Sequence, residues 1–376
     1  MKKKLLILID TVKPMVDGVS IFLDNILPHL SERYEITIIA PDYGPCDYKD
    51  AKLIQFPIRK SIFVDYGFPK IDRKIVRREV KNCDVVFNNE SVFPISSSFF
   101  AVKYAKKYRK PFFTYVHSID WELFVEAVYV PFFIKMMEKP LLKIYSKLFF
   151  SNCSGIVVPF KNIENIFKKN HINGRFEIIP VGISDIFKPG PSTFDSKDHV
   201  VLGYVGRVSI EKGLKLLLKT FLKLKAKYHN LFLLIVGDGP DKRIFDAQKD
   251  VKVTGFISQL EVADYLRAMD VFVLPSITET SSISTLEAMK SGLCCVTRNV
   301  GCIGDYLKHG FNGYFFDTDD ELLDILENLI KDEKLRKKIG MKGRKSVENY
   351  TWNNTANCLI EVFERHSNDS PHKSYK

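Results

Sequence analysis

Residues 271–297 contain two short apolar runs connected by one predicted helix, and this pattern constrains the fold more than any other part of the chain. The runs 271–274 and 293–297 have the length and β-branched character of buried strands. Between them, residues 282–291 carry apolar side chains at helical spacing and are followed by Gly292, which is typical of a helix C-terminus. A strand, a helix and a second strand in this order predict a parallel sheet with helices packed on its faces.

The same alternation of strand and helix patterns runs through most of the chain. It is interrupted by a polar stretch at 184–199, which we interpret as a linker. The chain is therefore predicted to be an α/β protein with two Rossmann-like, doubly wound domains. The predicted parts are a first domain at 1–183, a second domain at 200–350, a last helix at 351–366 and a disordered tail at 367–376.

The chain is strongly basic, with a formal net charge of +11 over 376 residues. Its apolar and charged fractions are those of an ordinary globular protein. The excess of cations favours a negatively charged partner, either an anionic lipid surface or a phosphorylated ligand. Nucleic acid is the least favoured partner, because the sequence contains no nucleic-acid-binding motif. A lysine-rich composition without any such partner is the alternative interpretation.

No segment is predicted to cross a membrane or to direct export. The N-terminal lysines and the apolar run 5–9 resemble a signal peptide only superficially, because the run is short and has no cleavage site. We interpret the run as a first strand and expect a cytoplasmic protein. No apolar stretch approaches the ~18 residues of a transmembrane helix. The seven cysteines are scattered without metal-ligand spacing, so we expect reduced thiols and no bound metal.

Two cations beside a turn predict an anion-binding site in the second domain. Gly206 and Arg207 close the predicted strand 200–205, and Lys212 precedes a helix. The amides of a helix start and two side-chain cations together suit a pyrophosphate. The alternative is that both cations are ordinary surface charges. In the first domain, Gly18 begins a helix and would let a ligand approach the backbone, although turns contain glycine for conformational reasons alone.

Two acids and one histidine complete the set of candidate residues. Glu279 and Glu287 flank the polar turn of residues 271–297. A carboxylate repels an anion bound beside it, so we expect these acids to bind neutral groups such as sugar hydroxyls. The alternative is that Glu279 interacts with the helix N-terminus and Glu287 is a solvated helix residue. His117 follows the predicted strand 112–116, at the sheet edge where ligands of α/β domains bind, and a structural histidine is an equally supported alternative.

Residues 121–150 form the most unusual segment, because basic and apolar side chains recur there at helical spacing. Basic amphipathic helices of this kind bind anionic membrane interfaces. For Leu141–Phe150 we favour the alternative that the apolar face packs on the sheet while lysines face water. For Trp121–Met137 the apolar surface is too broad for one helix face, so we favour an exposed surface on the acceptor side.

The order and spacing of these motifs resemble glycosyltransferase family 4, the retaining nucleotide-sugar transferases with the GT-B fold. The resemblance extends over nearly the whole chain, and its Asp-Gly-Val element is the form common among members that act on lipid acceptors. One departure concerns the turn after the first glutamate, where the family has a glycine and this chain has Thr280, Ser281 and Ser282. The matching elements are E-x7-E at 279–287, G-R-x4-K-G at 206–213, Asp17-Gly18-Val19, G-x-G-P at 237–240 and the strand end 114–120.

The resemblance implies a role for each matching residue. Two cations would neutralise the leaving diphosphate, Glu279 and His117 would lie at the donor sugar, and Glu287 would hold the ribose. Attack on the same face of the sugar would retain its configuration without a metal ion. The implied catalytic residues are His117, Arg207, Lys212 and Glu279, and the implied donor-binding residues are Gly18, Gly206, Gly237, Asp238, Gly255, Phe256, Ser281, Ser282, Ile283 and Glu287.

We therefore expect a retaining hexosyltransferase that moves a sugar from a UDP-sugar or GDP-sugar to a hydroxyl of a membrane lipid or lipid-linked glycan. It would need no cofactor and would act at the inner face of the cell membrane. The alternatives are a soluble transferase for a small-molecule or polysaccharide acceptor, and a noncatalytic scaffold that binds nucleotide sugars. The E-x7-E element and the lack of a lysine suited to pyridoxal phosphate disfavour an epimerase or a phosphorylase.

Overall fold

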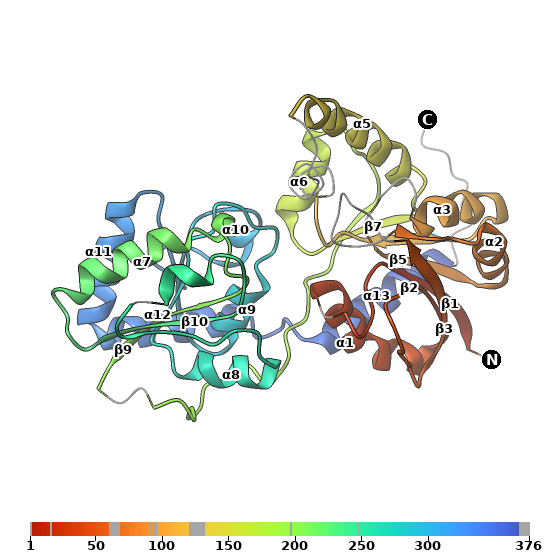
Figure 1. The fold of residues 1–376 in the computed structure, drawn as a ribbon. Coiled ribbons are helices and arrows are strands. Elements are labelled where there is room, and N and C mark those ends of the chain that lie inside the picture. Colours follow the sequence, from red (N-terminus) through yellow and green to blue (C-terminus); the bar gives the residue numbers. More distant parts are fainter. Residues whose placement is uncertain are drawn as a thin grey trace. The chain divides into compact units, whose positions relative to one another are not determined.

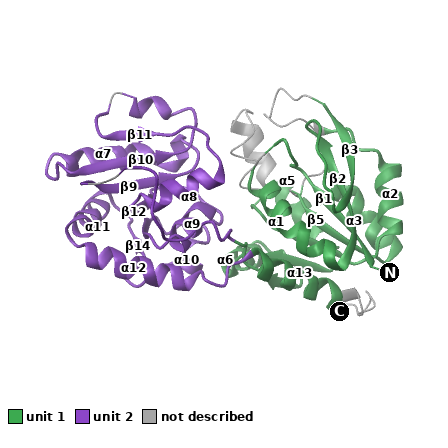
Figure 2. Ribbon diagram, turned by 90° about the horizontal axis from the view of Figure 1, so that it is seen from below, with its two compact units in different colours: residues 1–182, 352–376 green, residues 183–351 purple. Residues whose placement is uncertain are grey.

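The computed structural model shows two compact α/β units (Figure 2). Unit 1 comprises residues 1–182 and 352–376, and unit 2 comprises residues 183–351. The predicted tail lies outside the described residues, apart from Ser367. The structure describes residues 2–15, 17–59, 68–90, 92, 96–119, 132–195, 198–246 and 248–367.

The stretch predicted as a linker packs against unit 2. The Ser192 hydroxyl donates to the carbonyl oxygen of Asp264 at 2.9 Å. The ring of Phe194 lies 5.7 Å from the rings of Phe232 and Tyr265. These contacts assign the stretch to unit 2, and the division between the units falls between residues 182 and 183.

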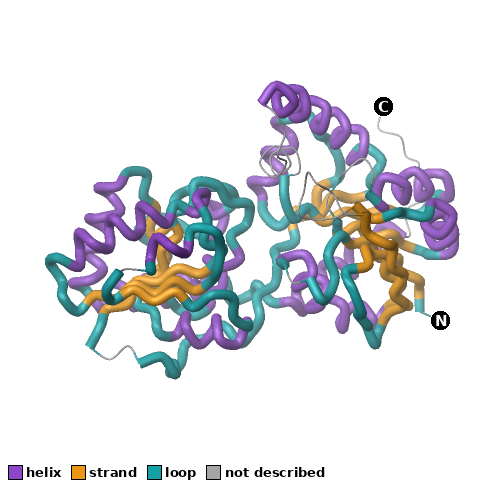
Figure 3. Tube along the Cα trace, in the orientation of Figure 1, coloured by secondary structure: helices purple, strands orange, loops and turns teal. Residues whose placement is uncertain are grey.

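Unit 1 is built on an eight-stranded sheet with the order β4-β3-β2-β1-β5-β6-β7-β8 (Figures 1 and 3). Neighbouring strands are parallel except for β3 and β4. The apolar run predicted as a first strand is confirmed, and Leu5–Ile9 are all buried, as in a sheet covered on both faces. The bounds are β1 Lys3–Ile9, β2 Tyr34–Asp42, β3 Ala51–Arg59, β4 Phe68–Pro69, β5 Val85–Asn89, β6 Phe112–Tyr115, β7 Gly155–Val158 and β8 Phe176–Ile178.

Helices cover both faces of this sheet (Figure 1). On one face, α1 packs against α13, the last helix of the chain, and the ring of Phe22 lies 5.7 Å from that of Trp352. Phe363 of α13 also lies 5.2 Å from Phe87 of β5, so the C-terminal helix completes the core of unit 1. The bounds are α1 Gly18–Arg33, α2 Arg73–Asn82, α3 Ser97–Tyr108, α5 Phe132–Phe150, α6 Lys161–Lys169 and α13 Trp352–Ser367.

Unit 2 contains a six-stranded parallel sheet with the order β11-β10-β9-β12-β13-β14. The strand, helix and strand predicted for residues 271–297 are confirmed, because β12 pairs with β13 and α9 connects them. The strands are β9 Val200–Val205, β10 Leu231–Val236, β11 Val251–Val253, β12 Val271–Leu274, β13 Cys294–Thr297 and β14 Tyr314–Phe315. The helices are η1 Ile210–Lys212, α7 Leu214–Lys225, η2 Lys242–Phe245, α8 Gln259–Arg267, α9 Ile283–Lys290, α10 Ile303–Tyr306, α11 Asp319–Lys331 and α12 Glu333–Ser346.

The strand order reverses at one point in each sheet, between β1 and β5 and between β9 and β12. In doubly wound sheets, ligands bind at the carboxyl ends of the strands at such a point. In unit 2, the loops that leave this point carry Arg207, Lys212 and Glu279. In unit 1, β5 ends at Asn89, and His117 lies just beyond the neighbouring strand β6. The topology therefore places the predicted residues at the two edges where ligands are expected.

Helix α5 only partly matches its prediction. Leu142, Phe149 and Phe150 are buried, as expected for one face packed on the sheet. Lys147 is exposed, also as expected, but three apolar residues are exposed as well, Leu141 at 61%, Ile144 at 59% and Leu148 at 62%. Of the predicted surface Trp121–Met137, only the backbone of 132–137 is described. Within the described chain, no helix is long and apolar enough to span a membrane.

Candidate active site

Three glycine turns meet at the carboxyl edge of the unit 2 sheet, after β9, β10 and β11. The N–H of Gly206 donates to the carbonyl oxygen of Val236 at 3.0 Å, and Gly237 forms an isolated β-bridge with Gly255. A Cβ atom on Gly237 would lie 1.9 Å from the carbonyl oxygen of Gly206, so only glycine allows these turns to pack. Backbone atoms thus form this edge, and a phosphorylated ligand can approach them closely.

Two exposed side chains flank the glycine turns. In the second turn, Oδ1 of Asp238 accepts the N–H of Gly239 at 2.8 Å, and Lys242 Nζ lies 3.8 Å from Oδ2. In the third turn, the ring of Phe256 is 80% exposed. An exposed aromatic ring beside a backbone edge can stack on a nucleotide base. The structure therefore brings together the predicted donor-binding residues of all three turns.

The predicted cations lie on the loop between β9 and α7. Lys212 Nζ is 2.8 Å from Oε1 of Glu279, which lies on the loop after β12. Only 23% of the Lys212 side chain and 11% of the Glu279 side chain are exposed, so solvent screens this pair weakly. Arg207 is exposed, and its side chain makes no hydrogen bond or ion pair within the described part of the chain. The two predicted cations and Glu279 thus lie where the strand order reverses.

Two residues that the sequence analysis did not single out hold the turn between β12 and α9. The buried hydroxyl of Tyr306 donates to the carbonyl oxygen of Ser281 at 3.0 Å, across 25 positions of sequence. Gly301 passes so close to the turn that a Cβ atom there would lie 2.1 Å from the carbonyl oxygen of Glu279. No local pattern in the sequence indicates either contact, because each depends on how α10 folds back onto the turn.

Ser282 adopts a left-handed conformation, with φ 46° and ψ 72°. Residues other than glycine rarely adopt it, and the position lies in the turn where the family has a glycine. The hydroxyl of Ser282 is 2.7 Å from that of Thr285 and does not cap α9. The starts of α8 and α11, by contrast, are capped by the side chains of Ser258 and Thr318. The amides at the start of α9 therefore lack a side-chain cap, which leaves them suited to an anion.

Glu287 lies one turn into α9 and is half-buried. Burial raises the pKa of its carboxyl group to about 8. Within the described residues, no group donates a hydrogen bond to this carboxyl or pairs with it. A half-buried acid without a protein partner is suited to binding ligand hydroxyls. Ile283 begins the same helix, so it lies beside the turn that contains Ser281 and Ser282.

His117 lies in unit 1, just beyond the carboxyl end of β6. Its Nε2 atom is 2.7 Å from Oδ1 of Asn89, which ends β5. The ring centroids of Phe22 and Tyr115 lie 5.0 Å and 4.8 Å from the centroid of the imidazole. Burial lowers the pKa of His117 to about 3, so the imidazole is neutral near pH 7. The histidine thus occupies the predicted edge, in a different unit from the cations and acids.

The N-terminus of α1 already binds a carboxylate of the protein. Oδ1 of Asp17 accepts the N–H of Val19 at 3.0 Å, the N–H of Ser20 at 2.8 Å and the hydroxyl of Thr11 at 2.8 Å. Gly18 is exposed, as a close approach by a ligand requires. An anion at this helix start would nevertheless compete with Asp17. Gly18 is therefore the predicted residue that the local geometry supports least.

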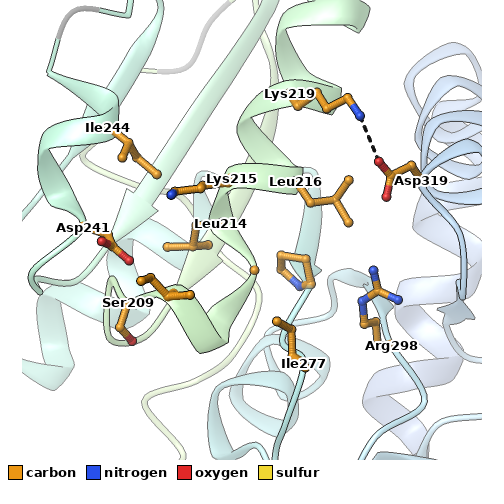
Figure 4. A pocket seen from close by; sticks show the side chains of 13 residues that line it. Ser209, Leu214, Lys215, Leu216, Lys219, Asp241, Ile244, Ile277, Arg298 and Asp319 are labelled. Carbon is orange, nitrogen blue, oxygen red and sulfur yellow. Dashed lines mark hydrogen bonds and ion pairs between the residues drawn. The ribbon is translucent and has the colours of Figure 1, made fainter.

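A cavity of about 430 Å³ adjoins the loop that carries Lys212 (Figure 4). Its walls come from η1, the start of α7, η2 and the start of α11, and from the loops after β9, β10, β12 and β13. Lys219 points toward Asp319 across its rim, with Nζ 3.1 Å from Oδ2, and Arg298 lies nearby. The 13 residues that line the cavity include none of the predicted site residues. The cavity is therefore a neighbour of the predicted site and not part of it.

Two family models match the chain. The model of glycosyl transferases group 1 matches residues 189–346, and the model of Glycosyltransferase Family 4 matches residues 16–185. The chain belongs to glycosyltransferase family 4. This family membership makes the protein a sugar-transferring enzyme, as the motifs predict. The roles predicted for individual residues of this glycosyltransferase remain predictions.

Relatives of this family 4 glycosyltransferase include a synthase of a glucosylated diacylglycerol and a sulfoquinovosyl transferase. The alpha-monoglucosyldiacylglycerol synthase of Acholeplasma laidlawii is 27% identical over 82% of this chain and 84% of its own length. The sulfoquinovosyl transferase SQD2 of Arabidopsis thaliana is 34% identical over 40% of this chain and 30% of its own length.

Solved structures confirm the predicted GT-B fold of this glycosyltransferase. Anabaena HepE, solved with UDP and glucose, has a TM-score of 0.73 at 16% identity and covers 96% of this chain and 99% of its own. WaaG, a glycosyltransferase of lipopolysaccharide biosynthesis, has a TM-score of 0.72 at 15% identity, again over 96% of this chain and 99% of its own. At these identities the similarity concerns the fold alone.

Proposed function

We propose that this glycosyltransferase moves a sugar from a UDP-sugar or GDP-sugar to a hydroxyl of a membrane lipid or lipid-linked glycan, with retention of configuration and without a metal or other cofactor. The observation that carries the proposal is the 2.8 Å ion pair between Lys212 and Glu279 at the point where the unit 2 strand order reverses. It combines a cation suited to a diphosphate with an acid suited to sugar hydroxyls. HepE, solved with UDP and glucose, supports this type of donor.

The donor diphosphate would bind between the cations and the start of α9. Arg207 is exposed and its side chain makes no hydrogen bond or ion pair within the described residues, so it can pair with a phosphate. Lys212 would exchange Glu279 for the diphosphate or share its donors between both. The uncapped start of α9 adds a positive dipole end. These groups supply the positive charge that a metal ion supplies in other transferases.

The nucleoside and the sugar would bind on either side of the diphosphate. Phe256, 80% exposed, offers a ring on which a base can stack, beside the backbone of the glycine turns. Glu287 would accept hydrogen bonds from the ribose, because its half-buried carboxyl has no partner in the described chain. Glu279 would accept hydrogen bonds from the sugar.

The transfer step exchanges one bond of the anomeric carbon for another. The bond from this carbon to the diphosphate oxygen breaks, and its electron pair leaves with the diphosphate. A bond from the carbon to the acceptor oxygen forms on the same face, and the acceptor proton passes to the departing diphosphate. Arg207 and Lys212 would stabilise the charge that develops on the leaving group. His117 would hold the donor sugar through a hydrogen bond.

A lipid acceptor is supported by relatives and by the surface of unit 1. The A. laidlawii relative is named as a synthase of a glucosylated diacylglycerol. In unit 1, α2, α3 and α5 form one layer, because Arg77 of α2 donates to the Tyr108 hydroxyl of α3 at 2.6 Å and the ring of Phe99 of α3 lies 6.0 Å from the ring of Tyr145 of α5. We call the outer surface of these helices the basic layer. Its exposed cations are Arg73, Lys74, Arg77, Arg78, Lys81, Lys103, Lys106, Lys107, Arg109 and Lys147.

The basic layer combines charge with an apolar stripe. Its only acid within α2 and α3 is Glu79, which is buried and pairs with Arg78 at 2.7 Å. Leu141, Ile144 and Leu148 recur every three or four residues along α5, so they form one exposed stripe. Apolar residues can enter the interface of a bilayer while cations contact anionic head groups, at ~1 kcal/mol per cation. We therefore propose peripheral binding to an anionic membrane surface through this layer.

Donor turnover tests the transferase part of the proposal. The full chain would be incubated without metal, with vesicles containing diacylglycerol and a panel of UDP- and GDP-sugars. We expect glycolipid from one donor, and we expect Lys212→Ala to lower kcat/KM by at least ~100-fold, the size typical of a lost transition-state donor. Lys215→Ala, which removes an exposed cation from α7, is the matched control and should retain activity. Equal losses in both variants would contradict the role of Lys212.

Vesicle binding tests the membrane part separately. We expect sedimentation with phosphatidylglycerol vesicles, weaker binding at high salt and little binding to phosphatidylcholine alone. A variant with Leu141→Ser, Ile144→Ser and Leu148→Ser should lose most of this binding. Leu222→Ser with Met341→Ser, which changes exposed apolar residues of unit 2, is the control. Full binding by the α5 variant would rule out the apolar stripe as the contact.

A further inference from the structure

The edge of the unit 1 sheet contains two adjacent buried asparagines with different partners. Asn88 and Asn89 end β5, and both side chains are fully buried. Asn88 donates from Nδ2 to the carbonyl oxygen of Glu90 at 3.1 Å and to the hydroxyl of Thr114 at 3.0 Å. Asn89 instead contacts the imidazole of His117, with Oδ1 2.7 Å from Nε2. Successive residues of a strand point to opposite faces, so one asparagine supports the sheet and the other reaches the histidine.

Asn89 cannot touch a substrate, because its side chain has no exposed surface. His117, by contrast, is half-buried. The rings of Phe22 and Tyr115 pack against the imidazole with centroids 5.0 Å and 4.8 Å away. Asn89 is therefore the polar contact of His117 within the described residues, and the other neighbours are aromatic rings.

The contact with Asn89 decides where the imidazole proton lies. An amide oxygen only accepts hydrogen bonds, so Nε2 of His117 must carry a proton to donate to Oδ1 of Asn89. Burial among aromatic rings lowers the pKa of His117, which keeps the ring neutral and allows it one proton. Nδ1 then has a free lone pair. Among the described residues, none forms a hydrogen bond with Nδ1.

We propose that Asn89 is a positioning residue that holds His117 as the Nε2–H tautomer, so that Nδ1 accepts a hydrogen bond from a hydroxyl of the substrate sugar. This inference rests on the proposed function for the sugar, but the tautomer does not depend on it. It explains why a fully buried amide lies behind a histidine at a ligand-binding edge. It also requires a sugar with a free hydroxyl at the position that reaches Nδ1, since a derivative without that proton could not donate.

The tautomer can be read directly by NMR. Long-range 1H–15N spectra of the uniformly 15N-labelled full chain distinguish Nε2–H from Nδ1–H, and His117→Gln identifies the signal. We expect Nε2–H for the unsubstituted protein. Asn89→Ala should give a mixture of tautomers, and Asn89→Asp should raise the pKa of His117, because a carboxylate stabilises the imidazolium. Asn88→Ala removes an equally buried amide with other partners and should leave the His117 signal unchanged.

Kinetics then connect the tautomer to sugar recognition. We expect Asn89→Ala to lower kcat/KM for the nucleotide sugar by about 10- to 100-fold, the size typical of a misplaced contact group. An Nδ1–H tautomer in the unsubstituted protein, or an Asn89→Ala variant with unchanged tautomer and unchanged kinetics, would overturn the proposal. If the expected tautomer were found but no nucleotide sugar were turned over, the proposed function would fail, and with it the sugar contact, while the link between Asn89 and His117 would stand.

Discussion

Nζ of Lys212 lies 2.8 Å from Oε1 of Glu279, although the two residues are 67 positions apart in the sequence. Only 11% of the Glu279 side chain is exposed, so solvent screens its attraction to the lysine weakly. The same lysine is the predicted contact of the donor diphosphate. Binding of a diphosphate would therefore change the electrostatic environment of the acid that is predicted to face the sugar.

The Lys212–Glu279 pair should show strong coupling in a double-mutant cycle. Lys212→Met leaves a poorly solvated carboxylate without its partner, and we expect it to lower the free energy of unfolding by about 1–3 kcal/mol. Glu279→Gln should reduce that loss when both changes are combined, because the unpaired charge is gone. Urea unfolding of the four proteins measures the cycle. Strictly additive free energies would show that the pair contributes nothing.

Glu287 should make stability depend on pH. Its pKa is about 8 in the folded chain against an ordinary value near 4.5, so the folded protein favours the protonated acid. The stability that this proton contributes is complete below about pH 4.5 and is lost as the pH rises to about 8. Glutamine cannot lose a proton, so the Glu287→Gln variant should not be destabilised in this way. The Tm of the variant minus the Tm of the unsubstituted protein should therefore increase from pH 5 to pH 8.5. A Tm difference that stays constant over this range would refute the raised pKa.

Ser282 should tolerate glycine better than alanine. Its left-handed backbone, with φ 46°, costs an L-residue about 1–2 kcal/mol, and glycine avoids this cost. Both substitutions remove the hydroxyl that lies 2.7 Å from that of Thr285, so the comparison isolates the backbone. We expect the Ser282→Gly variant to be about 1 kcal/mol more stable than the Ser282→Ala variant in urea unfolding. Equal stability, or a more stable alanine variant, would argue against a strained turn.

Gly301 and Gly310 offer a matched pair that separates crowding from conformation. Both have a positive φ, 59° and 71°, but a Cβ atom on Gly301 would lie 2.1 Å from the carbonyl oxygen of Glu279, whereas one on Gly310 would meet nothing within 4 Å. Both alanine variants should lose stability because of the positive φ. Gly301→Ala should lower the free energy of unfolding by about 1–3 kcal/mol more than Gly310→Ala, because its Cβ atom is also crowded. It should also reduce donor turnover, because it displaces Glu279. Similar losses of stability and activity in both variants would contradict this account.

Much of unit 2 could be predicted because its signals are local. The predicted strand 271–274 coincides with β12, and the predicted helix 282–291 is within one residue of α9 at each end. The spacing of apolar residues indicates which face of a single helix or strand is buried, and glycine indicates where turns occur. The same signals were less informative for α5, because they predicted a packed apolar face but did not separate the buried Leu142, Phe149 and Phe150 from the exposed Leu141, Ile144 and Leu148.

The sequence by itself determined the α/β class, the order of strands and helices, and the family, because these depend on local patterns and on motif spacing. Only the tertiary structure decided which distant groups meet: Lys212 with Glu279, His117 with Asn89, and Tyr306 with the turn at Ser281. It also decided that Glu287 is half-buried without a partner in the described chain and that Ser282 is left-handed. The physical reason is that a hydrogen bond, an ion pair or a pKa depends on neighbours in space, and strand pairing sets those neighbours across many positions of sequence.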